Sequence, residues 1–195
     1  MKINHDVMRK VILSMNITED GFLAGPNGEL DWHFPYWDFE MCEALSKLLS
    51  SADTILLGRK TYSAMAGYWT ANGIDSTISR GDIALSEMMN RYTKVVVSNT
   101  VRDFNWTNSM LLQGDLVKGI IELKEKPGKD IVVLGSSTLV AYLIQHSLID
   151  QYHLWIHPVI IRRGTAFPNL QYIKVNLKQA EVEVFNCGVS RVSYQ

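Results

Sequence analysis

The chain alternates short apolar runs with segments of helical periodicity. The apolar runs have the length and composition of strands, and they are Val11–Met15, Thr54–Leu57, Lys94–Ser98, Met110–Leu112, Ile131–Leu134, Tyr152–Ile161, Glu181–Phe185 and Val189–Tyr194. Other segments repeat apolar residues three and four positions apart, which predicts amphipathic helices over Phe39–Leu49, Ile83–Tyr92, Leu116–Leu123 and Leu139–Ile144. Because strands that alternate with helices form βαβ units, the pattern predicts a mostly parallel sheet with helices on both faces.

The last two runs have a different pattern. Val182 and Val184 alternate with glutamates, and the short loop 186–188 (Asn-Cys-Gly) separates the two runs. Alternation around a short loop is typical of a β-hairpin. We therefore expect antiparallel strands at one edge of a mixed sheet, in a single α/β domain that covers residues 1–195.

Composition supports one globular domain and excludes several classes of protein. The chain has 195 residues, 47% of them hydrophobic, and a formal net charge of −1. This apolar content excludes intrinsic disorder, and the balanced charge argues against a nucleic-acid binder. Cys42 and Cys187 lack the number and spacing of a disulfide framework or metal site. No apolar run approaches the ~20 residues of a membrane span, and the polar amino terminus is unlike a signal peptide. We therefore expect a cytoplasmic protein without a membrane or nucleic-acid partner.

Three predicted strands are followed by residues suited to an anion. In open α/β sheets, ligands bind where parallel strands end, near helix N-termini that favour phosphate. Small, hydroxyl or cationic residues follow the second, third and fifth runs, and they are Gly58, Arg59, Lys60, Thr61, Ser98, Asn99, Thr100, Gly135, Ser136, Ser137 and Thr138. Three such ends in one domain predict a continuous cradle for a dinucleotide. The chain has neither the GxGxxG fingerprint nor the GxxxxGK[ST] loop, so this is not an ordinary Rossmann or P-loop site.

Other side chains leave alternatives open. Asp31 and Asp38 are candidates for proton handling, or else a loop acid and an acid at a helix N-terminus. Trp32 and Trp37, with Tyr36 and Trp69, suit either core or dimer packing or stacking on a flat heterocycle.

His153 and His157 are four residues apart in a strand-like run, and no third ligand is evident. We therefore expect ordinary strand residues and no metal. The pair Arg162-Arg163 is typical of a solvated surface, with an anion contact as the alternative.

Four stretches together resemble the dihydrofolate reductase-like superfamily, which includes the reductase domain of riboflavin biosynthesis. They are the first strand and its loop, a Gly-Arg-x-Thr motif, a strand with a glycine turn and helix, and a long strand before a Gly-x-x-x-Phe-Pro-like loop. In this chain they read VILSMNITEDGFLAGPNGELD (Val11–Asp31), LGRKTY (Leu57–Tyr62), VLGSSTLVAYL (Val133–Leu143) and DQYHLWIHPVIIRRGTAFP (Asp150–Pro168).

The resemblance implies a three-layer fold, NADPH as cofactor and, from relatives, a homodimer. It places Arg59 and the loop Ser98–Thr100 at the adenosine 2′-phosphate. Lys60 and Thr61 would contact the pyrophosphate, and residues 135–137 would approach it from the other side. The implied activity is reduction of a pterin- or pyrimidine-like heterocycle, as in 5-amino-6-(5-phosphoribosylamino)uracil reductase or dihydrofolate reductase, on a CH–NH or CH–OH type of donor.

Two departures bear on the substrate. Gly135-Ser136 stands where dihydrofolate reductases usually have Gly-Gly. Their Trp-x-x-Pro-x-Asp pattern begins here at Trp32, but Trp37 occupies the acid position and Asp38 follows it. We therefore expect weak or no turnover of dihydrofolate. The alternatives are a non-catalytic nucleotide-binding or regulatory protein that retains the cofactor site, and an interaction protein with a vestigial site.

Overall fold

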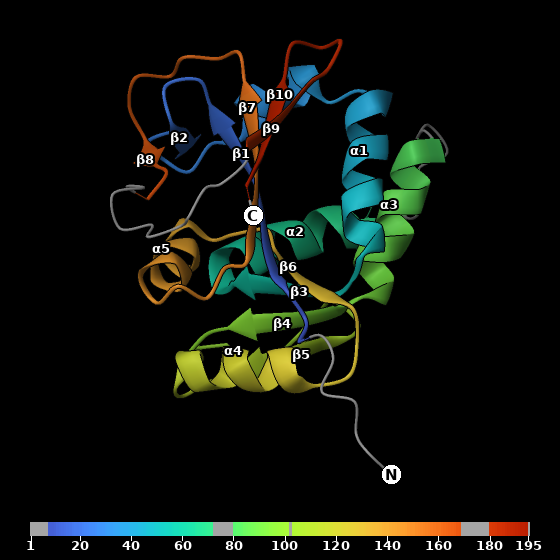
Figure 1. Cartoon of the computed structure of the whole chain (residues 1–195), viewed down its shortest axis with the longest axis vertical. Helices are drawn as coiled ribbons and strands as arrows, with labels where there is room; N and C mark the ends of the chain where they lie inside the picture. Colours follow the sequence, from blue (N-terminus) through green and yellow to red (C-terminus); the bar gives the residue numbers. More distant parts are fainter. Residues whose placement is uncertain (1–7, 72–79, 102, 169–179, 195) are drawn as a thin grey trace.

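The computed structural model describes residues 8–71, 80–101, 103–168 and 180–194 (Figure 1). Its strands are β1 (Val11–Thr18), β2 (Phe22–Ala24), β3 (Ala52–Gly58), β4 (Thr93–Val97), β5 (Ser109–Leu112), β6 (Asp130–Val133), β7 (Gln151–His157), β8 (Thr165–Ala166), β9 (Ala180–Val184) and β10 (Ser190–Tyr194). Its helices are the 3-10 helix η1 (Asp31–Tyr36), α1 (Phe39–Ser50), α2 (Arg59–Ala71), α3 (Arg80–Arg91), α4 (Leu116–Glu125) and α5 (Ser137–Gln145).

A mixed sheet runs in the order β5-β4-β3-β6-β1-β7-β10-β9. The strands from β5 to β7 are parallel, while β10 is antiparallel to both β7 and β9. The expected mostly parallel sheet with a C-terminal hairpin is therefore confirmed. Because the parallel strands point the same way, their carboxyl ends lie along one edge.

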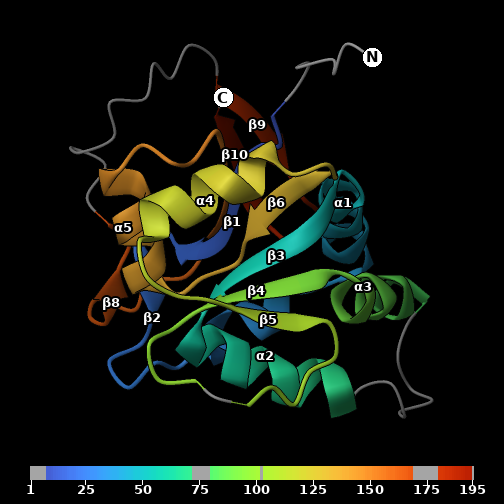
Figure 2. The same cartoon turned by 90° about the horizontal axis from the view of Figure 1, so that it is seen from below.

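Two apolar cores cover the two faces of the sheet. Successive residues of a strand point to opposite faces, so Ile131 and Val133 join one core while Val132 joins the other. Helices α4 and α5 pack on the first face, and α1, α2 and α3 pack on the second. Figure 2 shows α4 and α2 on opposite sides of β3, β4 and β5. The helices on both faces confirm the three-layer architecture.

The hairpin β9–β10 closes one end of the sheet. Gly188, with φ of +90°, allows the tight turn in which Phe185 donates its N–H to the carbonyl of Val189 at 2.9 Å. The alternating Val182 and Val184 of β9 are 62% and 69% exposed, and β9 is the last strand of the sheet.

Several elements escaped the sequence pattern. Helix α2 was not predicted, because aromatic and small residues (Tyr62, Met65, Ala66 and Trp69) form its buried side in place of the aliphatic residues that mark the other helices. Helix η1 and the pair β2–β8 are too short for a periodic signal. The run Tyr152–Ile161 was predicted as one strand, but β7 ends at His157 because Pro158 has no N–H to donate to a neighbouring strand.

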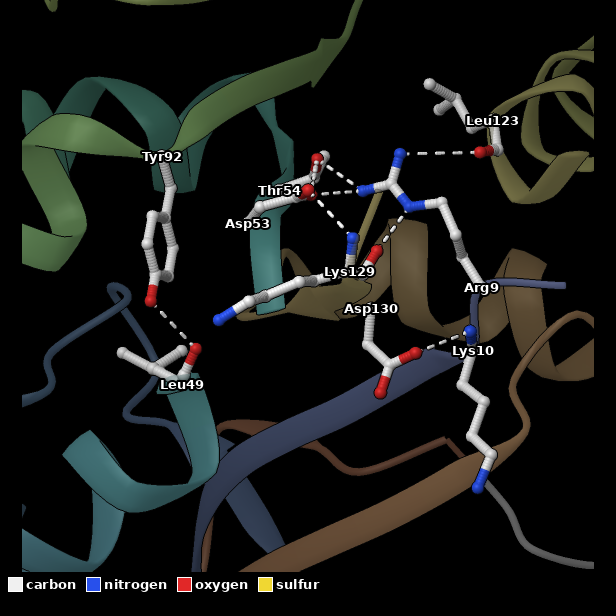
Figure 3. Close-up of polar contacts among 9 residues, drawn as sticks. All are labelled: Arg9, Lys10, Leu49, Asp53, Thr54, Tyr92, Leu123, Lys129 and Asp130. Carbon is white, nitrogen blue, oxygen red and sulfur yellow. Dashed lines mark hydrogen bonds and ion pairs between the residues drawn. The ribbon is translucent and has the colours of Figure 1, made fainter. Parts of the chain in front are cut away.

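A charged network joins the strands at the opposite, amino-terminal edge (Figure 3). The side chain of Arg9 is 93% buried, and its guanidinium donates to Asp53, Thr54 and the carbonyl of Leu123. A cavity of about 530 Å³ adjoins this network, and its other cations are Arg91, Lys126 and Lys129. Helices α1, α3 and α4 end here, and cations are favourable beside helix C-termini. The network therefore ties the amino-terminal ends of β1 and β3 to the end of α4.

Candidate functional site

The fold brings the predicted cofactor residues to one edge of the sheet. Gly58 ends β3, Ser98 follows β4, and Gly135 follows β6. Strands β4, β3 and β6 are neighbours in this order. The backbone N–H of Gly58 donates to the carbonyl of Gly135 at 2.9 Å, so the ends of β3 and β6 touch directly.

Two glycines permit a close approach between the backbones. A Cβ atom on Gly58 would lie 2.3 Å from Oγ and 3.1 Å from the backbone nitrogen of Ser136. Gly135 has φ of +124°, and a Cβ atom there would lie 3.0 Å from Oγ1 of Thr61. The peptide bond between Gly135 and Ser136 is cis. Any side chain at Gly58 or Gly135 would occupy the space between the two strand ends.

Two helix N-termini flank these glycines. Helix α2 begins at Arg59 directly after Gly58, and α5 begins at Ser137 after its N-cap residue Ser136. The hydroxyl of Ser136 makes no capping hydrogen bond to the helix. Helix N-termini offer free N–H groups and a positive dipole end. The geometry therefore sets two helix N-termini at the predicted anion cradle, with the exposed side chains of Arg59 and Lys60 beside it.

The loop after β4 is built around one serine. Oγ of Ser98 accepts the backbone N–H groups of Thr100 and Val101, both at 3.0 Å. This local turn leaves Asn99 and Thr100 exposed, next to the end of β3. The hydroxyl oxygen of Ser98 thus shapes the loop, and the outward side chains Asn99 and Thr100 are available to a ligand.

A cavity of about 500 Å³ continues the cradle past this loop. Its wall combines the ends of β4 and β5, the start of α4 and one ring from α5, and it consists of Val97, Asn99, Leu112, Gln113, Gly114, Asp115, Leu116, Val117 and Tyr142. The sequence analysis did not single out Gln113 or Tyr142. Gln113-Gly114-Asp115 also follows a predicted strand, so the rule applied to the other three strand ends could have found it.

The two aspartates before α1 are in different surroundings. Asp38 is the N-cap of α1, where its Oδ1 accepts the backbone N–H of Met41 at 2.9 Å. Asp31 is exposed at the start of η1. The capping contact shows that the Asp38 carboxylate already has a structural partner, the N–H of Met41.

The two tryptophans have different surroundings. Trp32 contacts His157 edge-to-face, with their ring centroids 5.2 Å apart. Trp37 packs with Leu45 and Leu48 of α1 against the cores. Trp32 therefore lies at the carboxyl end of β7, while Trp37 packs on α1.

The sequence analysis did not assign His157 to the site, and three rings of η1 surround this residue. This histidine is fully buried, and its Nε2 lies 3.1 Å from Oδ1 of Asn16 on β1. Trp32, His33 and Tyr36 of η1 have ring centroids 5.2, 5.9 and 5.8 Å from its ring. Burial, with a smaller effect of His33, lowers the pKa of His157 to about 4. The imidazole is therefore neutral at neutral pH.

The other histidine of β7 has its own partner. Nδ1 of His153 lies 2.8 Å from Oγ of Ser193 on β10. Burial and, to a lesser degree, the charge of Arg191 lower the pKa of His153 to about 4. Among the residues that the structure describes, no three His, Cys, Asp or Glu side chains are grouped so that they could hold a metal ion.

The fold places the chain in a known class. It is similar to a riboflavin biosynthesis protein from Shewanella sp. PV-4, with a TM-score of 0.69, 19% identity, and coverage of 96% of this chain and 98% of that one. It is also similar to dihydrofolate reductase from Enterococcus faecalis, with a TM-score of 0.58, 17% identity and 95% coverage of each chain. The architecture is thus that of dihydrofolate reductase-like proteins.

The family follows from the sequence. The model of the RibD C-terminal domain matches residues 9–190, and the chain belongs to this family. It is also 29% identical to the uncharacterized protein YyaP of Bacillus subtilis (strain 168) over 191 residues, which cover 98% of this chain and 97% of YyaP. None of the helices in the described ranges has both the length and the apolar character needed to cross a membrane.

Proposed function

We propose that this chain is an NADPH-dependent reductase of a small pyrimidine- or pterin-like heterocycle, acting on a CH–NH or CH–OH type of donor. The observation that carries the proposal is the contact between Gly58 and Gly135. It sets two helix N-termini side by side at the carboxyl edge of the sheet. A cradle of backbone N–H groups in this place suits a pyrophosphate.

The residues present fit a dinucleotide. A methyl group on Gly58 would fill the space in front of Ser136, so the cradle stays open only because both strand ends carry glycine. Residues 135–138 would hold the pyrophosphate from α5, and Lys60 and Thr61 from α2. Arg59, with Ser98, Asn99 and Thr100, would hold the 2′-phosphate, for which a guanidinium offers a fork of donors. The cavity beside Tyr142 has room for the adenine ring.

The carboxyl ends of β1 and β7 form the wall for the substrate in this proposal. When bound, NADPH supplies a hydride. The residues of the chain orient the flat heterocycle against the nicotinamide, with Trp32 or Trp37 as a stacking surface. Asp31 and Asp38 are the proposed proton donors, directly or through water. Of the two, Asp31 has the more accessible carboxylate.

Relatives support this assignment. A structure from Thermotoga maritima is described as a deaminase joined to a 5-amino-6-(5-phosphoribosylamino)uracil reductase. It matches 96% of this chain with a TM-score of 0.64 at 15% identity, while this chain covers 56% of it. The Enterococcus faecalis reductase is described as complexed with NADP(H). By analogy with these two proteins, we expect the present chain to use NADPH and to reduce a pyrimidine- or pterin-like ring.

A titration of the purified chain with NADPH, followed by the fluorescence of the cofactor, tests the first half of the proposal. Oxidation of NADPH on addition of 5-amino-6-(5-phosphoribosylamino)uracil or dihydrofolate tests the second half. Binding with oxidation supports the reductase. Failure to bind NADPH would overturn the proposal and leave an interaction protein with a vestigial site.

A second candidate is a non-catalytic nucleotide-binding or regulatory protein. The capping contact of Asp38 favours it, because this carboxylate already accepts the N–H of Met41. The observation that would select it is tight NADPH binding without oxidation by any tested heterocycle.

We further propose that the chain is a cytoplasmic homodimer. The edge strand β9 exposes Val182 and Val184, and an exposed apolar edge strand is a surface that a second copy can cover. A two-fold dimer is also the commonest assembly of globular chains.

A further inference from the structure

One ring nitrogen of His157 has a hydrogen-bond partner among the described residues, and the other has none. Nε2 lies 3.1 Å from Oδ1 of Asn16. An amide oxygen only accepts, so Nε2 carries the hydrogen and Nδ1 is a bare acceptor in the neutral ring. Nδ1 is buried and has no hydrogen-bond partner within the described part of the chain. Asn16 therefore fixes a tautomer whose acceptor is left unused.

A complementary donor lies beside this acceptor. The indole N–H of Trp32 is likewise buried and without a hydrogen-bond partner among the described residues. The rings of Trp32 and His157 are 5.2 Å apart between centroids. Buried polar groups are nearly always paired, so two unused groups of opposite type, side by side, indicate a ligand that supplies both partners.

The cover over this pair is light. Helix η1 lies over His157 through the rings of Trp32, His33 and Tyr36. None of the residues in η1 is buried, and Phe34 within it is 58% exposed. The side chains of His33 and Tyr36 are only half-buried. Turning their rings away from His157 would give a flat ring access to its Nδ1, beside the carboxyl ends of β1 and β7.

We propose that His157, oriented by Asn16, is a substrate-contacting residue that accepts a hydrogen bond from a ring N–H of the heterocycle. The indole N–H of Trp32 stays in place and donates to the adjoining acceptor of the same ring, while the rings of His33 and Tyr36 turn aside to admit it. This inference rests on the proposed function and adds to it. The neutral acceptor of His157 and the neutral donor of Trp32 would then bind the edge of a heterocycle on which a ring N–H is next to a carbonyl.

The test compares two probes, 5,6-diaminouracil and its 1,3-dimethyl derivative, which lacks the ring N–H groups. Affinities are measured calorimetrically with saturating NADPH. The wild-type chain should prefer the parent compound by about tenfold, the effect of one hydrogen bond to a buried group. His157→Phe keeps an aromatic ring but has no acceptor, and it should bind both probes equally. His153→Gln is the matched control on the same strand and should keep the preference.

A spectroscopic measurement separates direct contact from a structural role. In the ¹⁵N-labelled wild-type chain, Nδ1 of His157 should shift when the parent probe binds and stay in place with the dimethyl probe. If the wild-type chain binds the parent probe while Nδ1 does not respond and His157→Phe keeps the preference, the role of His157 is overturned and the proposed function stands. If the wild-type chain binds NADPH but neither probe, the uracil substrate class fails, and the role of His157 fails with it.

Discussion

The N–H of Gly58 donates to the carbonyl of Gly135 at 2.9 Å. A side chain on Gly58 would collide with Ser136, because even its Cβ would lie 2.3 Å from Oγ of Ser136. This relationship joins two strand ends that are far apart in sequence. It sets the N-termini of α2 and α5 beside one another, and the proposed cofactor site depends on it.

Gly58→Ala tests this contact. The added methyl would lie 2.3 Å from Oγ of Ser136, so the strand ends must separate. We expect NADPH affinity to fall at least tenfold and the free energy of unfolding to fall by about 1–3 kcal/mol, as overpacking generally costs. Gly67→Ala is the control, because nothing lies within 4 Å of its added methyl. It should leave NADPH affinity unchanged and stabilise α2 by roughly 0.5–1 kcal/mol. Equal NADPH affinity in both variants would contradict the cradle.

Cofactor preference tests Arg59. If its exposed guanidinium holds the 2′-phosphate, NADPH should bind about tenfold or more tightly than NADH, since a charge-assisted contact contributes roughly 1.5–3 kcal/mol. Arg59→Ala should remove most of that preference, while Lys47→Ala, an exposed cation on α1, should not. Equal affinities of the intact chain for NADPH and NADH, measured by fluorescence titration, would defeat the assignment.

Dihydrofolate turnover tests Asp38. Because its carboxylate caps α1, we expect weak turnover in the wild-type chain and no change in Asp38→Asn, which keeps the capping oxygen. Asp38→Ala should lower the free energy of unfolding by about 0.5–2 kcal/mol through loss of the cap. Steady-state kinetics and urea unfolding measure the two effects. Robust turnover that collapses in Asp38→Asn would show that Asp38 acts as the substrate acid after all.

The buried histidines predict acid sensitivity. Burial lowers the pKa of His153 and of His157 to about 4, with smaller contributions from Arg191 and His33. In the unfolded chain both would have a pKa of about 6.5 and bind protons first. Stability is therefore complete above pH 6.5 and falls as the pH drops towards 4, by up to about 3 kcal/mol for each histidine.

Urea unfolding at stepped pH measures this loss. Replacement of both histidines by Gln should flatten the curve between pH 6.5 and 4.5. His146→Gln, at an exposed position, should leave its shape unchanged. A wild-type curve that is already flat in this interval would contradict the prediction. Asp20 and Glu29 act at lower pH, because hydrogen bonds hold the pKa of each below its usual range.

The exposed edge strand predicts the assembly. Light scattering at micromolar concentration should return about twice the chain mass of 22.1 kDa. Val184→Lys places a charge on the exposed face of β9 and should shift the mass to that of one chain, whereas Glu183→Gln, also exposed, should not. A mass of about 22 kDa for the wild-type chain would reject the dimer.

The sequence by itself determined the sheet, its hairpin and the four periodic helices, because burial on one or both faces leaves a regular apolar pattern. It also identified the three strand ends near Gly58, Ser98 and Gly135, since parallel strands end along a common edge. Helix η1 was missed because it is too short for a periodic signal, and helix α2 because aromatic and small residues form its buried side.

Only the tertiary structure decided which side chains meet. Asn16 and His157 lie far apart in the sequence, and parallel pairing of β1 with β7 puts them 3.1 Å apart. The capping of α1 by Asp38 depends on where the helix begins, which a periodic pattern leaves uncertain by a residue or two. Strand register and helix start are set by packing across the whole sheet, so the partners in the site follow from the fold and not from the local pattern.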